Sequence, residues 1–162
     1  MASGWWRGRT RGILAPVSSP LDNQALPHIE RRLRERLAGE STIRWAYLFG
    51  SAARGETFRD LDVAVMLADD ARGPLPLGRV VALAEEAGAG IPVDVVDLAS
   101  SAPALAGRIV REGRVLVDRE PRARRSWEVD ANTRAIDIAP WLAEFERLRN
   151  EALRRREPHG RP

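Results

Sequence analysis

The apolar positions of this 162-residue chain change their period several times along its length. Between residues 22 and 38, apolar side chains recur three or four positions apart, which is the spacing of one helix face. They are Leu26, Ile29, Leu33 and Leu37. We expect a helix here, with Asp22 as its N-cap and Gly39 ending it. Residues 43–49 are instead a short continuous apolar run, which predicts a buried strand.

Along the rest of the chain, segments with a strand pattern alternate with segments with a helix pattern. Short runs rich in β-branched residues predict strands, and longer amphipathic stretches predict helices. Turn-forming residues predict a loop between the second strand and the helix after it. The expected elements are strands at 61–67, 93–98 and 114–117, helices at 77–87 and 103–111, and a loop at 69–76.

The C-terminal segment 122–156 predicts a long helix, with a break at Pro140 left open. Trp141, Phe145 and Leu148 repeat at helical spacing and give it an apolar face, suited to the core or to a partner interface.

This order of elements predicts an α/β or α+β fold. We expect a small mixed sheet of about four strands, with helices packed on it and a long C-terminal helix. The length indicates one domain, at 22–156. Residues 1–21 lack a periodic apolar face and are expected to be a flexible leader, and 157–162 a disordered tail.

The composition excludes several classes of protein. Hydrophobic residues make up 44% and charged residues 30%, as in ordinary globular proteins. Apolar runs stay short of the roughly 18 residues that a membrane span needs, and no signal peptide is recognisable. The absence of cysteine excludes disulfides and thiolate metal sites, and a cytoplasmic location fits.

The positive charge is concentrated at the two ends of the chain. All 26 basic residues are arginine, and the formal net charge is +3. The first 21 residues hold three arginines and no acid, and the last twelve hold four arginines and two glutamates. The body between them is mildly acidic, so direct nucleic-acid binding by the fold is not indicated.

The segment 47–67 carries the candidate chemistry. The strand at 43–49 ends in Gly50-Ser51, where a helical turn is expected to begin. Glycine lets a phosphate approach the backbone, free N–H groups at a helix start face an anion, and the Ser51 hydroxyl adds a donor. Arg54 is a further candidate phosphate contact, with a solvated surface position as the alternative.

Asp60 and Asp62 stand two positions apart at the start of the next strand. Side chains alternate along a strand, so both carboxylates are expected on one face. Two carboxylates beside a phosphate site suit Mg²⁺, which binds a few carboxylates together with substrate phosphates and water. Without a cation, the two carboxylates would repel each other and one would take up a proton.

A third acid is needed to hold a second metal ion and to accept the proton of an attacking hydroxyl. Asp94 and Asp97 lie three positions apart in one strand, so they face opposite sides and only one joins the site. We favour Asp94, which lies between valines in mid-strand, where a lone carboxylate is costly. Asp97 is expected to cap the helix near Pro103.

Gly-Ser, an Arg-Gly, Asp-x-Asp and a later strand with a single Asp together resemble the DNA polymerase β-like nucleotidyltransferase superfamily. The small size and the segments 93–98 and 109–117 are similar to its minimal members, the MNT-domain antitoxins of HEPN/MNT toxin–antitoxin pairs. The resemblance covers roughly residues 25–150.

The resemblance implies roles for the candidate residues. Gly50 and Ser51 would bind the triphosphate of ATP, and Asp60, Asp62 and Asp94 would hold two Mg²⁺ ions. It further implies transfer of AMP to a tyrosine of a HEPN-type toxin. The chain departs from the family at Arg59, where a small residue is usual, and in a short gap between Gly55 and Asp60.

Two other functions stay open. The chain could be a non-catalytic antitoxin that keeps the fold and blocks its partner by contact, which Arg59 favours. It could also be a nucleotidyltransferase that modifies an antibiotic-type small molecule as a dimer. Homo- and hetero-oligomers are both compatible with the sequence.

Overall fold

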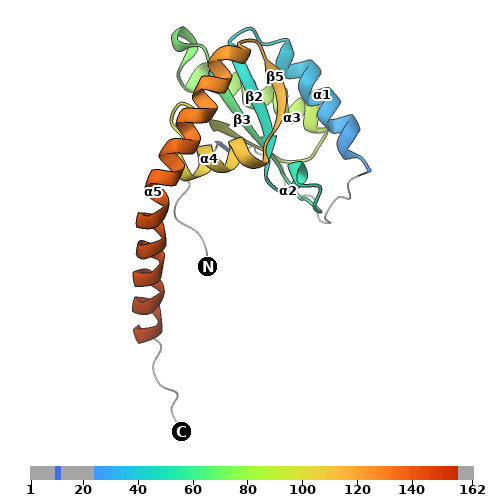
Figure 1. The fold of residues 1–162 in the computed structure, drawn as a ribbon. Coiled ribbons are helices and arrows are strands. Elements are labelled where there is room, and N and C mark those ends of the chain that lie inside the picture. Colours follow the sequence, from blue (N-terminus) through green and yellow to red (C-terminus); the bar gives the residue numbers. More distant parts are fainter. Residues whose placement is uncertain (1–9, 12–23, 157–162) are drawn as a thin grey trace.

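The computed structural model describes residues 10–11 and 24–156 of the chain and has the mixed α/β architecture expected from the sequence (Figure 1). The elements are β1 (Thr10–Arg11), α1 (Leu26–Ala38), β2 (Ile43–Phe49), α2 (Gly50–Ala53), β3 (Leu61–Leu67), the 3₁₀ turn η1 (Asp69–Ala71), α3 (Pro74–Gly88), β4 (Val93–Asp97), α4 (Pro103–Glu112), β5 (Arg114–Asp118) and α5 (Pro121–Arg156).

The strands form one sheet in the order β1-β4-β3-β2-β5. The pairing of β3 with β4 is parallel and the other pairings are antiparallel. The crossover from β3 to β4 runs through α3, as parallel neighbours require. The parallel pairing places the first residues of β3 and β4 at the same edge of the sheet.

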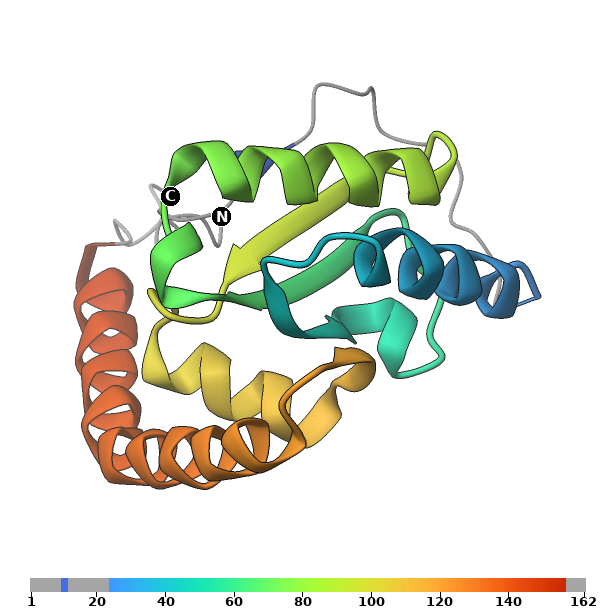
Figure 2. The same ribbon diagram turned by 90° about the horizontal axis from the view of Figure 1, so that it is seen from above.

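The two faces of the sheet are covered by different helices (Figure 2). Odd-numbered residues of β3, such as Val63, pack in one cluster with α1 and α3. Even-numbered residues, such as Ala64 and Met66, pack in a second cluster with α4 and the start of α5. This alternation decides which side chains reach each face.

Most expected elements are confirmed, with corrections at their ends. The loop expected at 69–76 is wrong in part: η1 occupies its start, and α3 begins at Pro74 rather than at residue 77. Proline suits the first turn of a helix because its missing N–H has no intrahelical partner there. The break left open at Pro140 does not interrupt α5, which continues through it, although the second half of the helix runs in a different direction from the first (Figure 2).

The ends of α1 also differ from expectation. The helix begins at Leu26 after Ala25, with Pro27 in its first turn and no side-chain cap. Asp22, the expected cap, lies outside the described residues. Gly39 follows the last residue of α1 as expected, in a right-handed conformation.

Part of the segment expected to be a leader is a strand. Thr10 pairs with Val95 and Arg11 with Asp94, which places β1 along the outer edge of β4. A two-residue strand has no periodicity that sequence analysis can detect. The rest of 1–21 and the tail 157–162 lie outside the described residues, so the domain boundaries remain a prediction.

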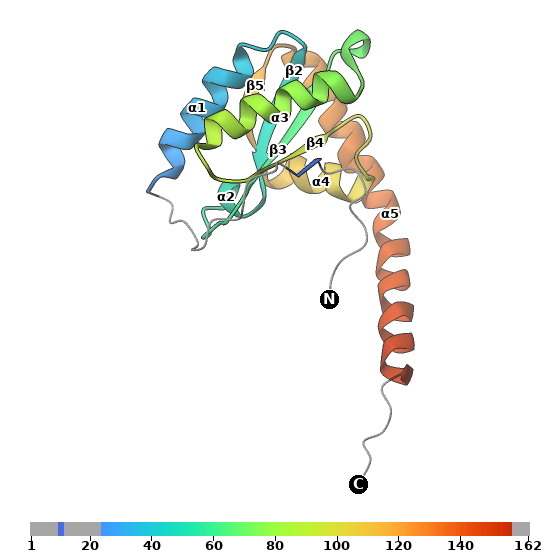
Figure 3. The same cartoon turned by 180° about the vertical axis from the view of Figure 1, so that it is seen from behind.

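The long helix α5 begins on the body of the protein and then projects from it (Figures 1 and 3). Its first half packs along α4. No helix in the described ranges combines the length and the apolar character that crossing a bilayer would demand.

Candidate active site

The backbone bends sharply where β2 passes into α2, and Gly50 makes this bend possible. Its φ is +73°, a left-handed conformation that favours glycine. A Cβ at this position would collide with Oδ2 of Asp62 and lie 3.0 Å from its Cγ. Glycine is therefore needed because the Asp62 carboxylate lies directly against the backbone, in addition to any room it leaves for a phosphate.

The α2 turn contains only residues Gly50–Ala53, so its macrodipole is small. Its anion-binding capacity rests on individual donors instead, namely backbone N–H groups and the Ser51 hydroxyl. No side chain caps the turn. Gly50 lies directly against Asp62, Ser51 follows it in the turn, and the binding of phosphate by both residues remains a prediction.

Asp62 and Asp94 are register partners in the parallel pair β3–β4. Both occupy even positions, and the even positions that follow them, such as Ala64 and Val96, lie in the cluster under α4 and α5. The side chains of Asp62 and Asp94 therefore project from the same face of the sheet. Asp94 is only 5% exposed. Two acidic side chains held side by side in a largely buried place favour the binding of a cation.

Asp60, unlike Asp62 and Asp94, lies outside the strands of the sheet. It lies in a bend just before β3, and it is partly buried. Strand alternation, on which its expected alignment with Asp62 rested, begins only at Leu61. Across the described segments, no three acidic or histidine side chains are grouped so as to hold a metal ion. The metal-binding role of Asp60 stays a prediction, and exposed Arg59 lies in the same bend.

Asp97 has a local role at the other end of β4. Its Oδ1 accepts a hydrogen bond from the Ala99 backbone N–H at 3.0 Å, and its Oδ2 lies 3.2 Å from the Ser100 hydroxyl. It thus caps the turn after the strand. The expectation that it caps the helix near Pro103 is wrong, since α4 has no side-chain cap and follows Ala102.

Arg54 is held by two carboxylates beside the site. It forms ion pairs with Glu56 at 2.7 Å and Glu112 at 2.9 Å. These hydrogen bonds raise the pKa of Arg54 and lower that of Glu56. Burial alone would raise the pKa of Glu112, but hydrogen bonds from Arg108 and Arg54 outweigh it and the pKa falls. Arg54 therefore ties the α2 turn to the end of α4, and its contact with phosphate stays a prediction.

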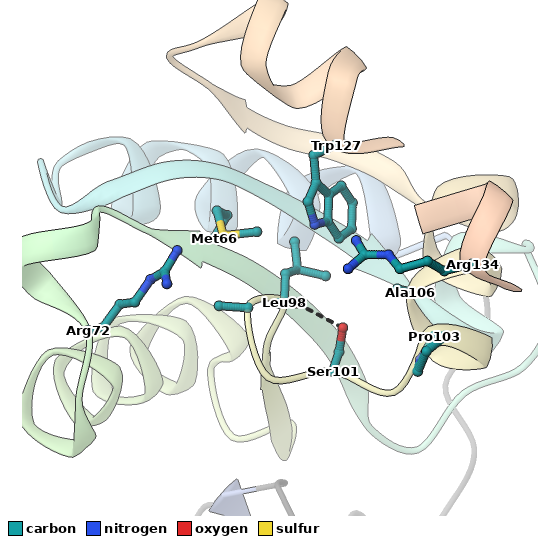
Figure 4. A pocket seen from close by; sticks show the side chains of 9 residues that line it. Met66, Arg72, Leu98, Ser101, Pro103, Ala106, Trp127 and Arg134 are labelled. Atoms are coloured by element: carbon teal, nitrogen blue, oxygen red, sulfur yellow. Dashed lines mark hydrogen bonds between the residues drawn. The ribbon is translucent and has the colours of Figure 1, made fainter. Parts of the chain in front are cut away.

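A pocket of about 220 Å³ lies at the opposite end of β3, on the same face of the sheet (Figure 4). Met66, Leu98 and Trp127 form its apolar lining, and Arg72 and Arg134 point into it from two sides. No acid lines it. Sequence analysis missed this pocket, because its residues come from five separate elements and loops.

The fold resembles solved structures at low sequence identity. A chain in a structure of a tri-AMPylated Shewanella oneidensis HEPN toxin in complex with MNT antitoxin aligns with a TM-score of 0.56 and 22% identity, over 79% of this chain and 98% of that one. A chain from a mutant MntA toxin–antitoxin complex aligns with a TM-score of 0.58 and 23% identity, over 76% and 98%. A toxin–antitoxin structure with AMP-PNP gives 0.50 and 23%, over 76% and 94%. At these identities the likeness establishes the fold.

Comparison with curated protein sequences finds no match. The model of one protein family, described as "Polymerase beta, Nucleotidyltransferase", matches residues 31–122. This range contains Gly50, Ser51, Asp60, Asp62 and Asp94. The family match confirms the enzyme class expected from the motif. The chain therefore belongs to the polymerase β nucleotidyltransferase family.

Proposed function

We propose that this protein transfers AMP from ATP to a tyrosine hydroxyl of a HEPN-type toxin and so acts as its antitoxin, in the cytoplasm. Gly50 and Ser51 bind the triphosphate. Asp60, Asp62 and Asp94 hold Mg²⁺, and Asp94 also accepts the proton of the attacking hydroxyl.

The single observation that carries the proposal is the pairing of Asp62 with Asp94 on one face of the sheet, with Asp62 against Gly50. Nucleotidyl transfer needs carboxylates and a phosphate-binding turn within reach of one another. Here the turn at Gly50 and the carboxylates lie close together, where β2 ends and β3 and β4 begin, because Phe49 is the register partner of Asp62.

The donor set fits a hard divalent cation. Asp62 and Asp94 offer carboxylate oxygens from neighbouring strands, and Asp60 lies two residues before Asp62. Mg²⁺ commonly takes one or two protein carboxylates and completes its shell with substrate phosphates and water. When bound, the metal neutralises the charge of the triphosphate and of the leaving pyrophosphate. A two-metal arrangement is our proposal.

The reaction is an in-line substitution at the α-phosphorus. The acceptor oxygen forms a bond to this phosphorus, and the bond to the bridging α–β oxygen breaks. Pyrophosphate leaves with that electron pair, and the hydroxyl proton passes to the Asp94 carboxylate. Asp94 suits this role by its position, because it is the register partner of Asp62 at the start of β4.

The proposed partner follows from the structural neighbours. The similar chains come from complexes of a HEPN toxin with an MNT antitoxin, one of which contains an AMPylated toxin. Another toxin–antitoxin structure contains AMP-PNP, an ATP analogue. These complexes favour a protein acceptor over a small molecule.

Transfer of label tests the proposal. The purified chain is incubated with α-³²P-ATP, Mg²⁺ and a HEPN-type protein from the same organism. We expect label on the HEPN protein with the wild type and with Asp97→Asn, and none with Asp62→Asn. A toxin silenced by the wild type and by Asp62→Asn alike, without label, would instead support the non-catalytic antitoxin.

A further inference from the structure

The half of α5 that projects from the body exposes large apolar side chains. Trp141 is 69% exposed, Leu148 50% and Phe145 39%. The rings of Trp141 and Phe145 stack with centroids 6.2 Å apart. We call Trp141, Phe145 and Leu148 the α5 stripe.

The stripe lies next to the face of α5 that packs on α4 and overlaps it at Phe145. Ala131, Ile138 and Phe145 follow one another at intervals of seven residues, so they share one helix face. Ala131 is fully buried, and a Cβ on Gly107 of α4 would collide with Ala135 one turn further on. Beyond the end of α4, Phe145 lies on this face, and Trp141 and Leu148 lie beside it on one side of the helix. A partner that covers the stripe therefore packs along the projecting half, next to the side that α4 covers in the first half.

The charges along the projecting half reverse in sign. Residues 137–146 contain three acids and no arginine, whereas 147–156 contain five arginines and one glutamate. Two copies of this segment in antiparallel orientation place each acidic half against a basic half. Parallel copies place like charges together.

The position of α4 also selects the antiparallel arrangement. In a parallel pair, the first half of the second α5 would need the space along the first half of α5 that α4 already fills. α5 projects well clear of the body (Figure 3), so in an antiparallel pair only the projecting halves need to overlap.

We propose that the α5 stripe binds a second copy of this chain, with the projecting halves of α5 packed antiparallel and Phe145 and Leu148 near the twofold axis. The inference is independent of nucleotide transfer, since the stripe lies on the projecting helix and not at the carboxylates.

The oligomeric state of the full chain, purified without a partner, tests the inference. Analytical ultracentrifugation is expected to show a dimer for the wild type. Changing Trp141→Glu together with Phe145→Glu should raise the dimer dissociation constant by roughly tenfold or more, because buried aromatic anchors dominate such interfaces. The matched control is Ile136→Glu, which is also 69% exposed but lies on the opposite side of α5, and it should leave the dimer intact.

The orientation is read from one spin label per chain. The chain has no cysteine, so Ala139→Cys gives a unique site. With the twofold axis between residues 146 and 147, the two labels in an antiparallel pair are offset by roughly 22 Å along the helix axes. In a parallel pair they lie side by side, separated only by the roughly 10 Å between the two axes. A short distance would overturn the antiparallel arrangement.

Three other results would overturn the proposal as a whole. The first is a wild-type monomer at every concentration tested. The second is a dimer that survives the double substitution while circular dichroism shows an unchanged fold. The third is a monomer in which the stripe substitutions abolish binding to the HEPN protein, which would assign the surface to that partner.

Discussion

The two ends of the β3–β4 pair use aspartate in opposite ways. Where the strands begin, Asp62 and Asp94 lie side by side next to Gly50, and Asp94 is nearly inaccessible to solvent. Where β4 ends, Asp97 accepts hydrogen bonds from its own turn. The same residue type, three positions apart, thus stabilises a turn in one place and lies beside a second acid in the other. Asp97 faces the N–H and O–H groups of its own turn, whereas Asp94 is paired in register with another aspartate.

The largest expected effect comes from exchanging Asp94 for asparagine. Asp94→Asn should lower the single-turnover transfer rate by roughly a thousandfold, the scale on which general-base catalysis acts. ATP affinity should fall far less, because Gly50, Ser51 and the other acids remain. Measuring rate and affinity separately distinguishes a catalytic role from a binding role.

Asp97→Asn is the matched control for that exchange. It removes a carboxylate from the same strand and should leave the rate nearly unchanged, with a loss of about 1 kcal/mol in the free energy of unfolding. The reverse ranking of the two variants would show that Asp97 is the acid that serves the reaction.

The next effect concerns the backbone beside Asp62. Gly50→Ala should destabilise the fold by about 2–4 kcal/mol, because it adds a collision with the Asp62 carboxylate to the strain of a positive φ. Gly90→Ala is the control, since Gly90 also has a positive φ, +92°, but nothing lies within 4 Å of its added Cβ. Urea unfolding measures both. Equal losses would mean that the close approach of Asp62 contributes nothing.

A smaller effect is expected from ligands. Mg²⁺ alone should raise the melting temperature slightly, and Mg²⁺ with ATP by several degrees, since a ligand at 100 times its Kd contributes about 2.7 kcal/mol. Thermal scans with EDTA, Mg²⁺, ATP and both ligands measure this. Asp62→Asn should remove most of the combined shift, and four identical wild-type curves would contradict a Mg²⁺–ATP site.

The smallest effect is expected at Arg54. Its ion pairs with Glu56 and Glu112 are solvent-screened, so Arg54→Ala should change the stability little. If Arg54 also contacts phosphate, the Kd for ATP should rise, by less than about tenfold. Arg108→Ala is the control, because Arg108 binds the same Glu112. An ATP affinity that is equal in both variants would leave Arg54 a purely structural role.

Much of this arrangement could be predicted from the sequence. Periodicity located the four main strands and the helices, because each buries a continuous apolar face. Strand alternation separated Asp94 from Asp97, since even positions face α4 and α5. These inferences depend on local pattern alone, which a single sequence contains.

Other features depend on distant parts of the chain and could not be predicted. The strand β1 exists because the edge of β4 is available to Thr10 and Arg11. The contact between Gly50 and Asp62 requires the register of β2 on β3. The expected alignment of Asp60 with Asp62 assumed a regular strand, but the bend before Leu61 interrupts it.

The central claim is that the carboxylates beside Gly50 transfer AMP to a protein partner. Its most direct test is the intact mass of the HEPN protein after co-expression with this chain, followed by peptide mapping. The account predicts one or more added AMP groups on tyrosine with the wild type and with Asp97→Asn, and an unmodified partner with Asp62→Asn. An unmodified partner with the wild type, or modification that persists with Asp62→Asn, would contradict it.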